Sequence, residues 1–105
     1  TRINWGTVTT FITTPNQPIA SIPVSGITGI EYLVKGIDAA GAKYSIATVQ
    51  AVTDGTNVDF ATFATLNLGG MTGVFIVQVA SGNIELQVTP STSNSTVWTT
   101  QVRLI

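Results

Sequence analysis

The sequence of 105 residues contains no cysteine and no histidine, and it has only four Lys or Arg and five Asp or Glu residues. The absence of cysteine excludes disulfides, thiolate metal sites and thiol nucleophiles. The absence of histidine removes the usual general base and the usual ligand of transition metals. With a net charge of −1, the chain has no field of one sign that attracts a polyanion, so we expect no nucleic-acid partner.

Long apolar runs and export signals are missing as well. No stretch approaches the length of a membrane span, and residues 1–10 lack the basic and apolar blocks of a signal peptide. We therefore expect no membrane partner and a protein that is made, and used or assembled, in a cytoplasm. The leading Thr fits a chain whose initiator Met was removed, which predicts a whole gene product.

The sequence is rich in β-branched residues: 18 Thr, 12 Val and 11 Ile make 41 of 105. Such side chains favour strands over helices, and turn signals recur about every ten residues. The pattern predicts one all-β domain over residues 1–105, an antiparallel β-sandwich (Ig-like or jelly-roll-like) of about eight strands, with a closed barrel as second choice. The expected extended segments are residues 2–11, 14–25, 29–37, 42–53, 58–68, 74–80, 84–89 and 96–104.

Alternation of apolar and polar residues predicts which side chains form the core. The last two segments alternate clearly, and segment 58–68 places Phe60, Leu66 and Leu68 on one face. Segment 74–80 is apolar on both faces, which predicts a central or covered strand. The expected core includes Trp98, Phe60, Ile76, Leu86 and Tyr32.

Few side chains are candidates for chemistry. Asp54, Asn57 and Asp59 form an oxygen-rich set that could bind Ca²⁺, but Asp and Asn also form turns, and we favour the turn. Two carboxylates can hydrolyse a glycoside only if they share a cleft, and nothing in the sequence brings together Glu31, Asp38 and Glu85. We therefore predict no catalytic residues, no metal, no cofactor and no enzymatic activity.

Aromatic side chains are the better candidates for binding. The Trp5 ring could equally cap the core or contact a partner, and on the surface it would form with Arg2 and Phe11 the kind of anchor that dominates protein interfaces. Alternatively, a planar row of Trp5 with Tyr32 or Tyr44 could stack on sugar rings. The residues alone leave both readings open.

Two segments read together resemble a known module. The segment YSIATVQAVTDGTNVD at residues 44–59 is followed by LQVTPS at 86–91 and STV at 95–97. In this order they resemble a module repeated in virion structural and tail proteins of marine phages that infect cyanobacteria. The resemblance covers about residues 30–100. A separate chain of this size is similar to the knob-like decoration proteins on the heads of short-tailed cyanobacterial phages.

The resemblance implies a non-enzymatic virion structural protein on the capsid exterior, assembled in the host cytoplasm and bound to the major capsid protein or another virion protein. Residues 1–27 have no counterpart in the module, so we expect them to form a docking segment or an added edge strand. The expected interface residues are Arg2, Trp5, Phe11, Pro15 and Pro18.

Two further readings stay open. The chain could instead be a carbohydrate or host-surface binding module of a phage tail or fibre, which requires exposed aromatic rings. Edge strands can also pair with a neighbouring copy, so a homodimer formed by sheet extension is a third arrangement compatible with the sequence.

Overall fold

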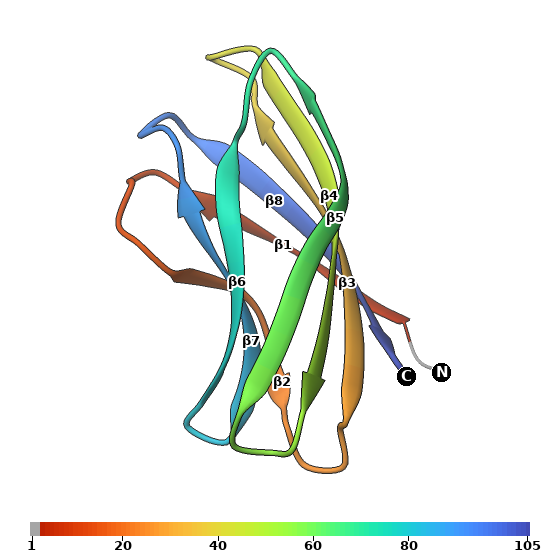
Figure 1. The fold of residues 1–105 in the computed structure, drawn as a ribbon. Coiled ribbons are helices and arrows are strands. Elements are labelled where there is room, and N and C mark those ends of the chain that lie inside the picture. The colour runs from red at the N-terminus through yellow and green to blue at the C-terminus, as the bar shows by residue number, and fades with distance from the viewer. Residues whose placement is uncertain (1–2) are drawn as a thin grey trace.

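The computed structural model describes residues 3–105, and within that range every regular element is a β-strand (Figure 1). The strands are β1 (Ile3–Thr10), β2 (Gln17–Pro23), β3 (Gly29–Asp38), β4 (Lys43–Thr53), β5 (Val58–Leu68), β6 (Gly73–Ala80), β7 (Asn83–Pro90) and β8 (Thr96–Leu104). Strands β5 and β8 begin and end at the predicted residues. Across residues 3–105 no helix is long and apolar enough to cross a membrane.

The strands form two sheets that face each other. The larger has the order β1-β8-β3-β4-β5 and the smaller the order β2-β7-β6, and all neighbouring strands are antiparallel. One cluster of buried side chains lies between the sheets. The predicted all-β sandwich is therefore confirmed, and the two sheets do not join into a closed barrel.

The core consists of the inward-facing side chains of both sheets. Trp98 and Leu86 are fully buried and Tyr32 is almost so, as predicted. The rings of Trp98 and Phe75 meet edge to face, with centroids 5.6 Å apart and planes at 88°. Gly36 makes room for the indole, because a Cβ on Gly36 would lie 2.8 Å from Trp98 Cε3.

β5 departs from the predicted alternation at a bulge. Ala64 has a positive φ of 52°, and the pairing of β4 with β5 shifts by one residue opposite it. An extra residue moves the side chains that follow to the other face of the strand. Phe60, opposite the buried Ala51, faces inward, whereas Leu66 and Leu68 face outward. The prediction that these three residues share a core face is therefore wrong, and Phe60 is 37% exposed.

β6 was expected to be central or covered, but it is an edge strand of the smaller sheet and pairs only with β7. Its second apolar face lies on the outside of the sandwich, where Val74 is 56% exposed. Ile76 is half-buried beside Gln87 and does not belong to the core cluster, so its predicted place was also wrong.

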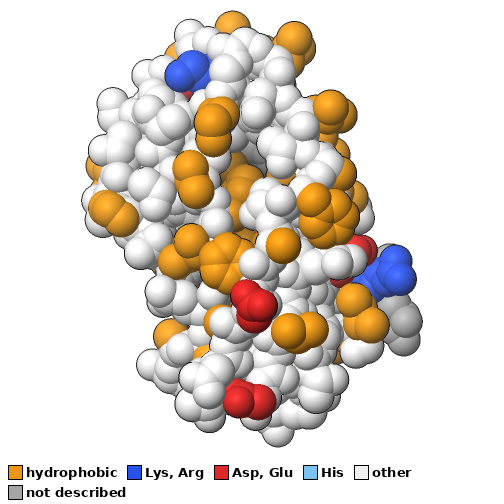
Figure 2. Space-filling model, in the orientation of Figure 1, with side chains coloured by type: hydrophobic (Ala, Val, Ile, Leu, Met, Phe, Trp, Pro, Cys, Tyr) orange, Lys and Arg blue, Asp and Glu red, His pale blue; other side chains and the backbone are white. Residues whose placement is uncertain are grey.

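The two edge strands β5 and β6 lie on the same side of the sandwich. This side, made of β5, β6 and the residues 69–72 between them, is called here the open side, because nearly every side chain of β5 is exposed, those directed at the smaller sheet included. Figure 2 views the molecule from the open side and shows many hydrophobic side chains over it.

The first third of the chain supplies the opposite edges. β1 pairs with β8 in the larger sheet and β2 pairs with β7 in the smaller one, so the chain crosses between the sheets at residues 11–16. β2 contains Pro18 and Pro23, and its pairing has a bulge between Pro18 and Ala20. A proline has no N–H to donate, so a strand of this composition suits a sheet edge.

Candidate functional site

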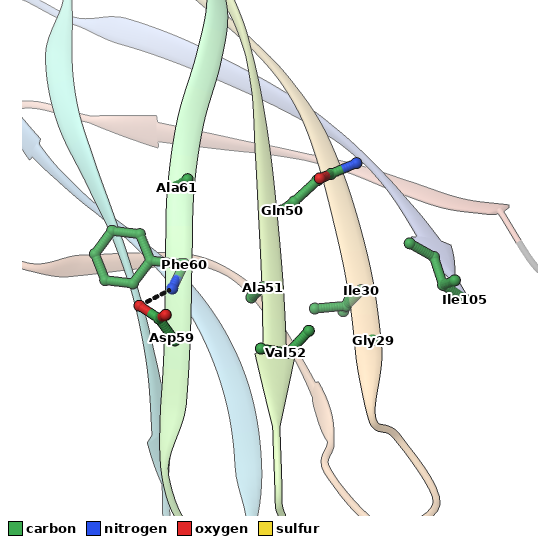
Figure 3. Close-up of a pocket in the computed structure, with 9 residues that line it drawn as sticks. All are labelled: Gly29, Ile30, Gln50, Ala51, Val52, Asp59, Phe60, Ala61 and Ile105. Carbon is green, nitrogen blue, oxygen red and sulfur yellow. Dashed lines mark hydrogen bonds between the residues drawn. The ribbon is translucent and has the colours of Figure 1, made fainter.

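A hollow of about 320 Å³ lies on the larger sheet where β3, β4 and β5 run side by side (Figure 3). It is on the half of the sheet next to the β4–β5 turn. The residues that matter for its chemistry are Gly29, Gln50, Val52, Asp59, Ala61 and Ile105.

Two small residues produce the depression. Gly29, Val52 and Asp59 form one row across the three strands, and Gln50 and Ala61 belong to the next row. Gly29 has no side chain and Ala61 has only a methyl group, so nothing tall covers the space around Val52. The Val52 side chain is accordingly 62% exposed.

Ile105 forms the wall on the side of β3. Its backbone N–H donates a hydrogen bond of 3.1 Å to the carbonyl oxygen of Gly29, and its side chain is 69% exposed. Val52 and Ile105 therefore give the hollow an apolar floor and one apolar wall. The Phe60 ring lies beyond β5, on the side away from Ile105 (Figure 3).

A chain of three polar side chains leads across the outer face of the sheet to the hollow. Arg103 Nη1 lies 3.8 Å from Glu31 Oε1, and Gln50 Nε2 donates a hydrogen bond of 2.9 Å to Glu31 Oε2. A carboxylate can only accept hydrogen bonds, so Glu31 holds the Gln50 amide nitrogen on the β3 side. Figure 3 shows the amide oxygen turned away from that nitrogen, toward the hollow.

Asp59 stands on the β5 side of the hollow. Its Oδ1 accepts a hydrogen bond of 3.0 Å from the backbone N–H of Phe60. Among the residues that the structure describes, no donor pairs with Oδ2 of Asp59. Gln50 Oε1 and Asp59 Oδ2 are therefore two acceptors without a partner among the described residues. Gln50 is two residues from the exposed Val52 on β4, and Asp59 pairs with Val52 from β5, with its carboxylate on the Phe60 side of that strand (Figure 3).

This arrangement favours one chemical class of ligand. Two acceptors bind a molecule that offers hydroxyl or amino donors, and the apolar floor packs against C–H groups. The carboxylate of Asp59 repels an anionic ligand. A neutral saccharide, with a C–H face and hydroxyl groups at its rim, combines these properties.

The interface residues predicted from the sequence lie elsewhere. Arg2 is outside the described residues, and so is the side chain of Trp5, whose backbone belongs to β1. Phe11 is 62% exposed, and Pro15 and Pro18 are exposed too. These last three do not line the hollow, and their role in an interface stays a prediction.

The oxygen-rich set at the β4–β5 turn behaves as the turn that the sequence favoured. Asp54 Oδ1 accepts hydrogen bonds from the backbone N–H groups of Asn57 at 2.7 Å and Thr56 at 2.9 Å. These two bonds, that from Asn57 first, lower the pKa of Asp54 below its usual value. Within residues 3–105 no three acidic side chains converge as metal ligands would.

The three carboxylates considered for glycoside hydrolysis are not brought together. Glu31 lies on the outer face of β3, and Glu85 belongs to the smaller sheet, where its Oε1 accepts a hydrogen bond of 2.9 Å from Gln87 Nε2. Asp38 is fully buried at the end of β3 and accepts a hydrogen bond of 3.0 Å from the N–H of Gly41. These bonds give Asp38 and Glu85 structural roles.

Exposed rings, which the host-surface reading requires, are present. Tyr44 is 42% exposed on the outer face of β4, whereas Tyr32 is buried. Tyr44 is six residues from Gln50 on the same strand, or about 20 Å along it, so its ring is separate from the hollow.

Sequence reasoning missed Gln50, Val52 and Ile105 as site residues, because pairing between distant segments brings them together. One local signal was available: the Asp54–Asn57 hairpin turn places Val52 opposite Asp59. The positions of Gly29 and Ile105 had no comparable signal.

No protein-family model matches the chain, and no curated protein matches it. Among solved structures, the chain is similar to the tailspike protein of Acinetobacter baumannii phage AM24, with a TM-score of 0.63 and 9% identity over 98% of this chain and 26% of that one. It is also similar to the tailspike protein of Acinetobacter phage vB_ApiP_P1, with a TM-score of 0.56 and 15% identity over 96% and 22% of the two chains. Tailspike gp49 of Acinetobacter baumannii bacteriophage Fri1, described as a capsular polysaccharide depolymerase, has a TM-score of 0.47 and 11% identity over 95% and 17%.

At these identities the likeness shows the fold alone. The chain spans about a quarter of the length of the AM24 and vB_ApiP_P1 tailspikes. These structures are tailspike proteins of Acinetobacter phages, and neither cyanobacterial phages nor capsid knobs occur among them, so the expected connection with phage structural proteins stays a prediction. The exclusion of enzymatic activity was wrong as stated, because a fold found in tailspike proteins gives no ground to exclude an activity. The sandwich described above has the fold of a part of phage tailspike proteins.

Proposed function

We propose that this chain is a host-surface binding module of a phage tail protein and that it holds a neutral saccharide in the hollow on β3, β4 and β5. One observation carries the proposal: Gln50 Oε1 and Asp59 Oδ2, neither engaged by the described residues, belong to the neighbours of the exposed Val52 on β4 and β5. The likeness of the fold to tailspikes supports a place on the virion, at the tail.

Binding in the hollow follows from its walls. A pyranose ring packs its C–H face on Val52 and Ile105, and its hydroxyl groups donate to Gln50 Oε1 and Asp59 Oδ2. Glu31 does not touch the sugar but holds the Gln50 amide in the required orientation. A single shallow site of this kind binds at about millimolar Kd, or roughly −4 kcal/mol, so useful attachment depends on several sites acting together.

Immobilised oligosaccharides test the saccharide site. The Ala61→Trp variant fills the hollow with an indole, and Ala61 is exposed, so the fold tolerates the larger side chain. The matched control is Ala40→Trp, which places the same ring on the exposed β3–β4 turn. We expect the unmodified chain and Ala40→Trp to be retained on neutral glycans and Ala61→Trp to be lost.

Removing one of the two acceptors should weaken saccharide binding without abolishing it. Gln50→Ala removes one acceptor and leaves the floor intact, and the loss of about 1 kcal/mol corresponds to roughly fivefold weaker binding. Unchanged retention of Ala61→Trp, or stronger retention on acidic glycans than on neutral ones, would contradict the proposed site.

The place on the virion is tested separately. Gold-labelled antibody against the chain should decorate the tails of intact virions in electron micrographs. Label spread over the capsid would contradict the tail assignment and would favour the capsid decoration role expected from the sequence.

A further inference from the structure

The open side of the sandwich is free of charge over a long stretch of sequence. No Asp, Glu, Lys or Arg occurs from Phe60 to Ile84, a segment that contains nearly all of β5 and the whole of β6. In Figure 2 hydrophobic side chains gather in the central part of this side, with charged side chains at the top, the right-hand rim and in the lower half. The large apolar side chains exposed in this segment are Phe60 and Met71, with Phe63, Leu66 and Leu68 on the outer face of β5 and Val74 on the outer face of β6.

The free edge of β5 carries little protection against pairing with another strand. β5 pairs with β4 only, so one edge of this 11-residue strand has no partner strand among the described residues. Proteins protect such edges with proline, lysine, bulges or short strands. β2 at the opposite edge has Pro18 and Pro23, whereas β5 has the bulge at Ala64 and one charge, Asp59, near its start.

The space between β5 and β6 adds a shallow cleft to the open side. It has a volume of about 120 Å³ and is lined by Ala47, Phe75 and Met71 among others. Of the four polar residues of the larger sheet that line it, two satisfy each other, since Ser45 Oγ donates a hydrogen bond of 2.8 Å to Asn67 Oδ1; the others are Thr62 and Thr65. The cleft therefore presents mostly apolar atoms to whatever covers it.

We propose that a second copy of this chain covers the open side, with the two β5 strands paired antiparallel about a twofold axis. In such a contact the same patch serves both partners, so residues 60–84 of one copy, which carry no charge, meet the same residues of the other. A net charge of −1 gives the two copies little mutual repulsion.

The dimensions agree with this contact. A stable interface takes about 800 Å² from each partner. The molecule measures 40 × 24 × 20 Å, and the open side runs along its long axis, so it offers an area of about that size. The total surface of the chain is 5586 Å², which leaves most of it free.

The pairing has a consequence for the outer face. Two larger sheets joined through β5 form one continuous sheet with the outer faces on the same side, so two hollows face the same direction. The dimer stands independently of the saccharide site and would form whether or not the hollow binds sugar.

The molar mass in solution tests the dimer. Light scattering after size exclusion should give twice the 11.0 kDa mass of the chain at high concentration. Leu66→Lys and Leu68→Lys place a charge on the outer face of β5, at side chains that are 69% exposed, so the fold is kept. In the joined sheet the lysines of the two copies would lie on the same face beside the paired strands and repel each other, so the contact is lost. Val97→Lys places the same charge on the outer face of β8 and serves as the control.

We expect a concentration-dependent dimer for the unmodified chain and for Val97→Lys, and a monomer for both β5 variants, with the strand signal in circular dichroism retained in all four. A monomer at every concentration of the unmodified chain, or a dimer unaffected by Leu66→Lys, would overturn the proposal. Binding of a soluble monovalent oligosaccharide by Leu66→Lys should be unchanged. Failure of the dimer proposal can therefore be distinguished from failure of the proposed saccharide site.

Single cysteines test the geometry, because the chain has none of its own. In an antiparallel twofold pairing, residues near the axis face their own copies, and a disulfide forms where the Cβ atoms are about 4 Å apart. A cysteine scan over residues 61–68 should give covalent dimers at one or two adjacent positions, and Val97→Cys should give none. Equal yields along β5 and at Val97→Cys would contradict a specific pairing.

Discussion

Trp98 Nε1 donates a hydrogen bond of 2.9 Å to Thr10 Oγ1, a residue 88 positions earlier in the chain. Both side chains are buried. The indole N–H has no water to bond with in the core, so the Thr10 hydroxyl provides the acceptor that it needs. This bond ties the end of the first strand to the largest side chain of the core.

Thr10→Val should destabilise the protein by about 1–3 kcal/mol, because it keeps the shape of the side chain and leaves the indole N–H without an acceptor. Thr10→Ser keeps the hydroxyl and should cost less. Urea denaturation followed by tryptophan fluorescence measures both free energies of unfolding. Equal stability of Thr10→Val and the unmodified chain would show that the bond contributes nothing.

Gly36→Ala should destabilise by about 1–3 kcal/mol, since its Cβ would lie 2.8 Å from Trp98 Cε3 and 2.7 Å from Thr72 Oγ1. Gly6→Ala is the matched control, because nothing lies within 4 Å of a Cβ on Gly6. Thermal unfolding of the two variants compares them directly. If Gly36→Ala and Gly6→Ala unfold at the same temperature, the indole does not need the space that Gly36 leaves.

Tyr32 should limit stability at alkaline pH. Burial, with the negative charge of Glu85 as a second cause, raises the pKa of Tyr32 well above its usual value, and its hydroxyl has no hydrogen-bond partner in the described structure. The folded chain therefore keeps this proton after the unfolded chain begins to release it near pH 10. The stability that the neutral Tyr32 hydroxyl contributes is fully present below about pH 10, and it is lost as the pH rises toward the pKa of the folded state.

Tyr32→Phe should accordingly unfold with a flatter pH profile above about pH 9.5, and it should be no less stable at pH 7, since the hydroxyl that it removes is unbonded. Denaturation at a series of pH values measures the profile, with Tyr44→Phe, an exposed site, as the control. If Tyr32→Phe loses as much stability at alkaline pH as the unmodified chain, the loss comes from another titrating group.

Ala64→Gly should leave stability unchanged or raise it by up to about 1 kcal/mol, because glycine adopts positive φ without the steric cost that alanine bears. Ala61→Gly, in the same strand and without a positive φ, should instead lose about 0.5–1 kcal/mol. Guanidinium denaturation gives the two free energies. Changes of the same sign in both variants would contradict the reading of Ala64 as the strained residue of the bulge.

The strand boundaries could be predicted because the signals for strand ends are local. The Asp54–Asn57 turn, the glycines at 69 and 70 and the Ser81-Gly82 turn stand in the sequence next to the strands that they end. Strict alternation likewise predicted the buried faces of β7 and β8, where Leu86 and Trp98 are fully buried.

The faces of β5 and the place of β6 could not be predicted in the same way. A bulge at Ala64 reverses the alternation, and alanine gives no sign of a positive φ. The two apolar faces of β6 indicate burial on both sides, but on this strand one face lies outside against Gln87. The hollow depends on pairing of β3, β4 and β5 with the last residue, Ile105, and a pattern within one segment holds no information on that contact.

The first and last strands of the sandwich are paired with each other, and Ile3 stands opposite Arg103. In an antiparallel pair the two free ends lie at the same end of the ladder. Tension applied through both chain ends at once would therefore peel β1 from β8 one hydrogen bond at a time, which takes much less force than sliding the strands past each other. A mechanically loaded particle would gain strength by anchoring this sandwich through one end only.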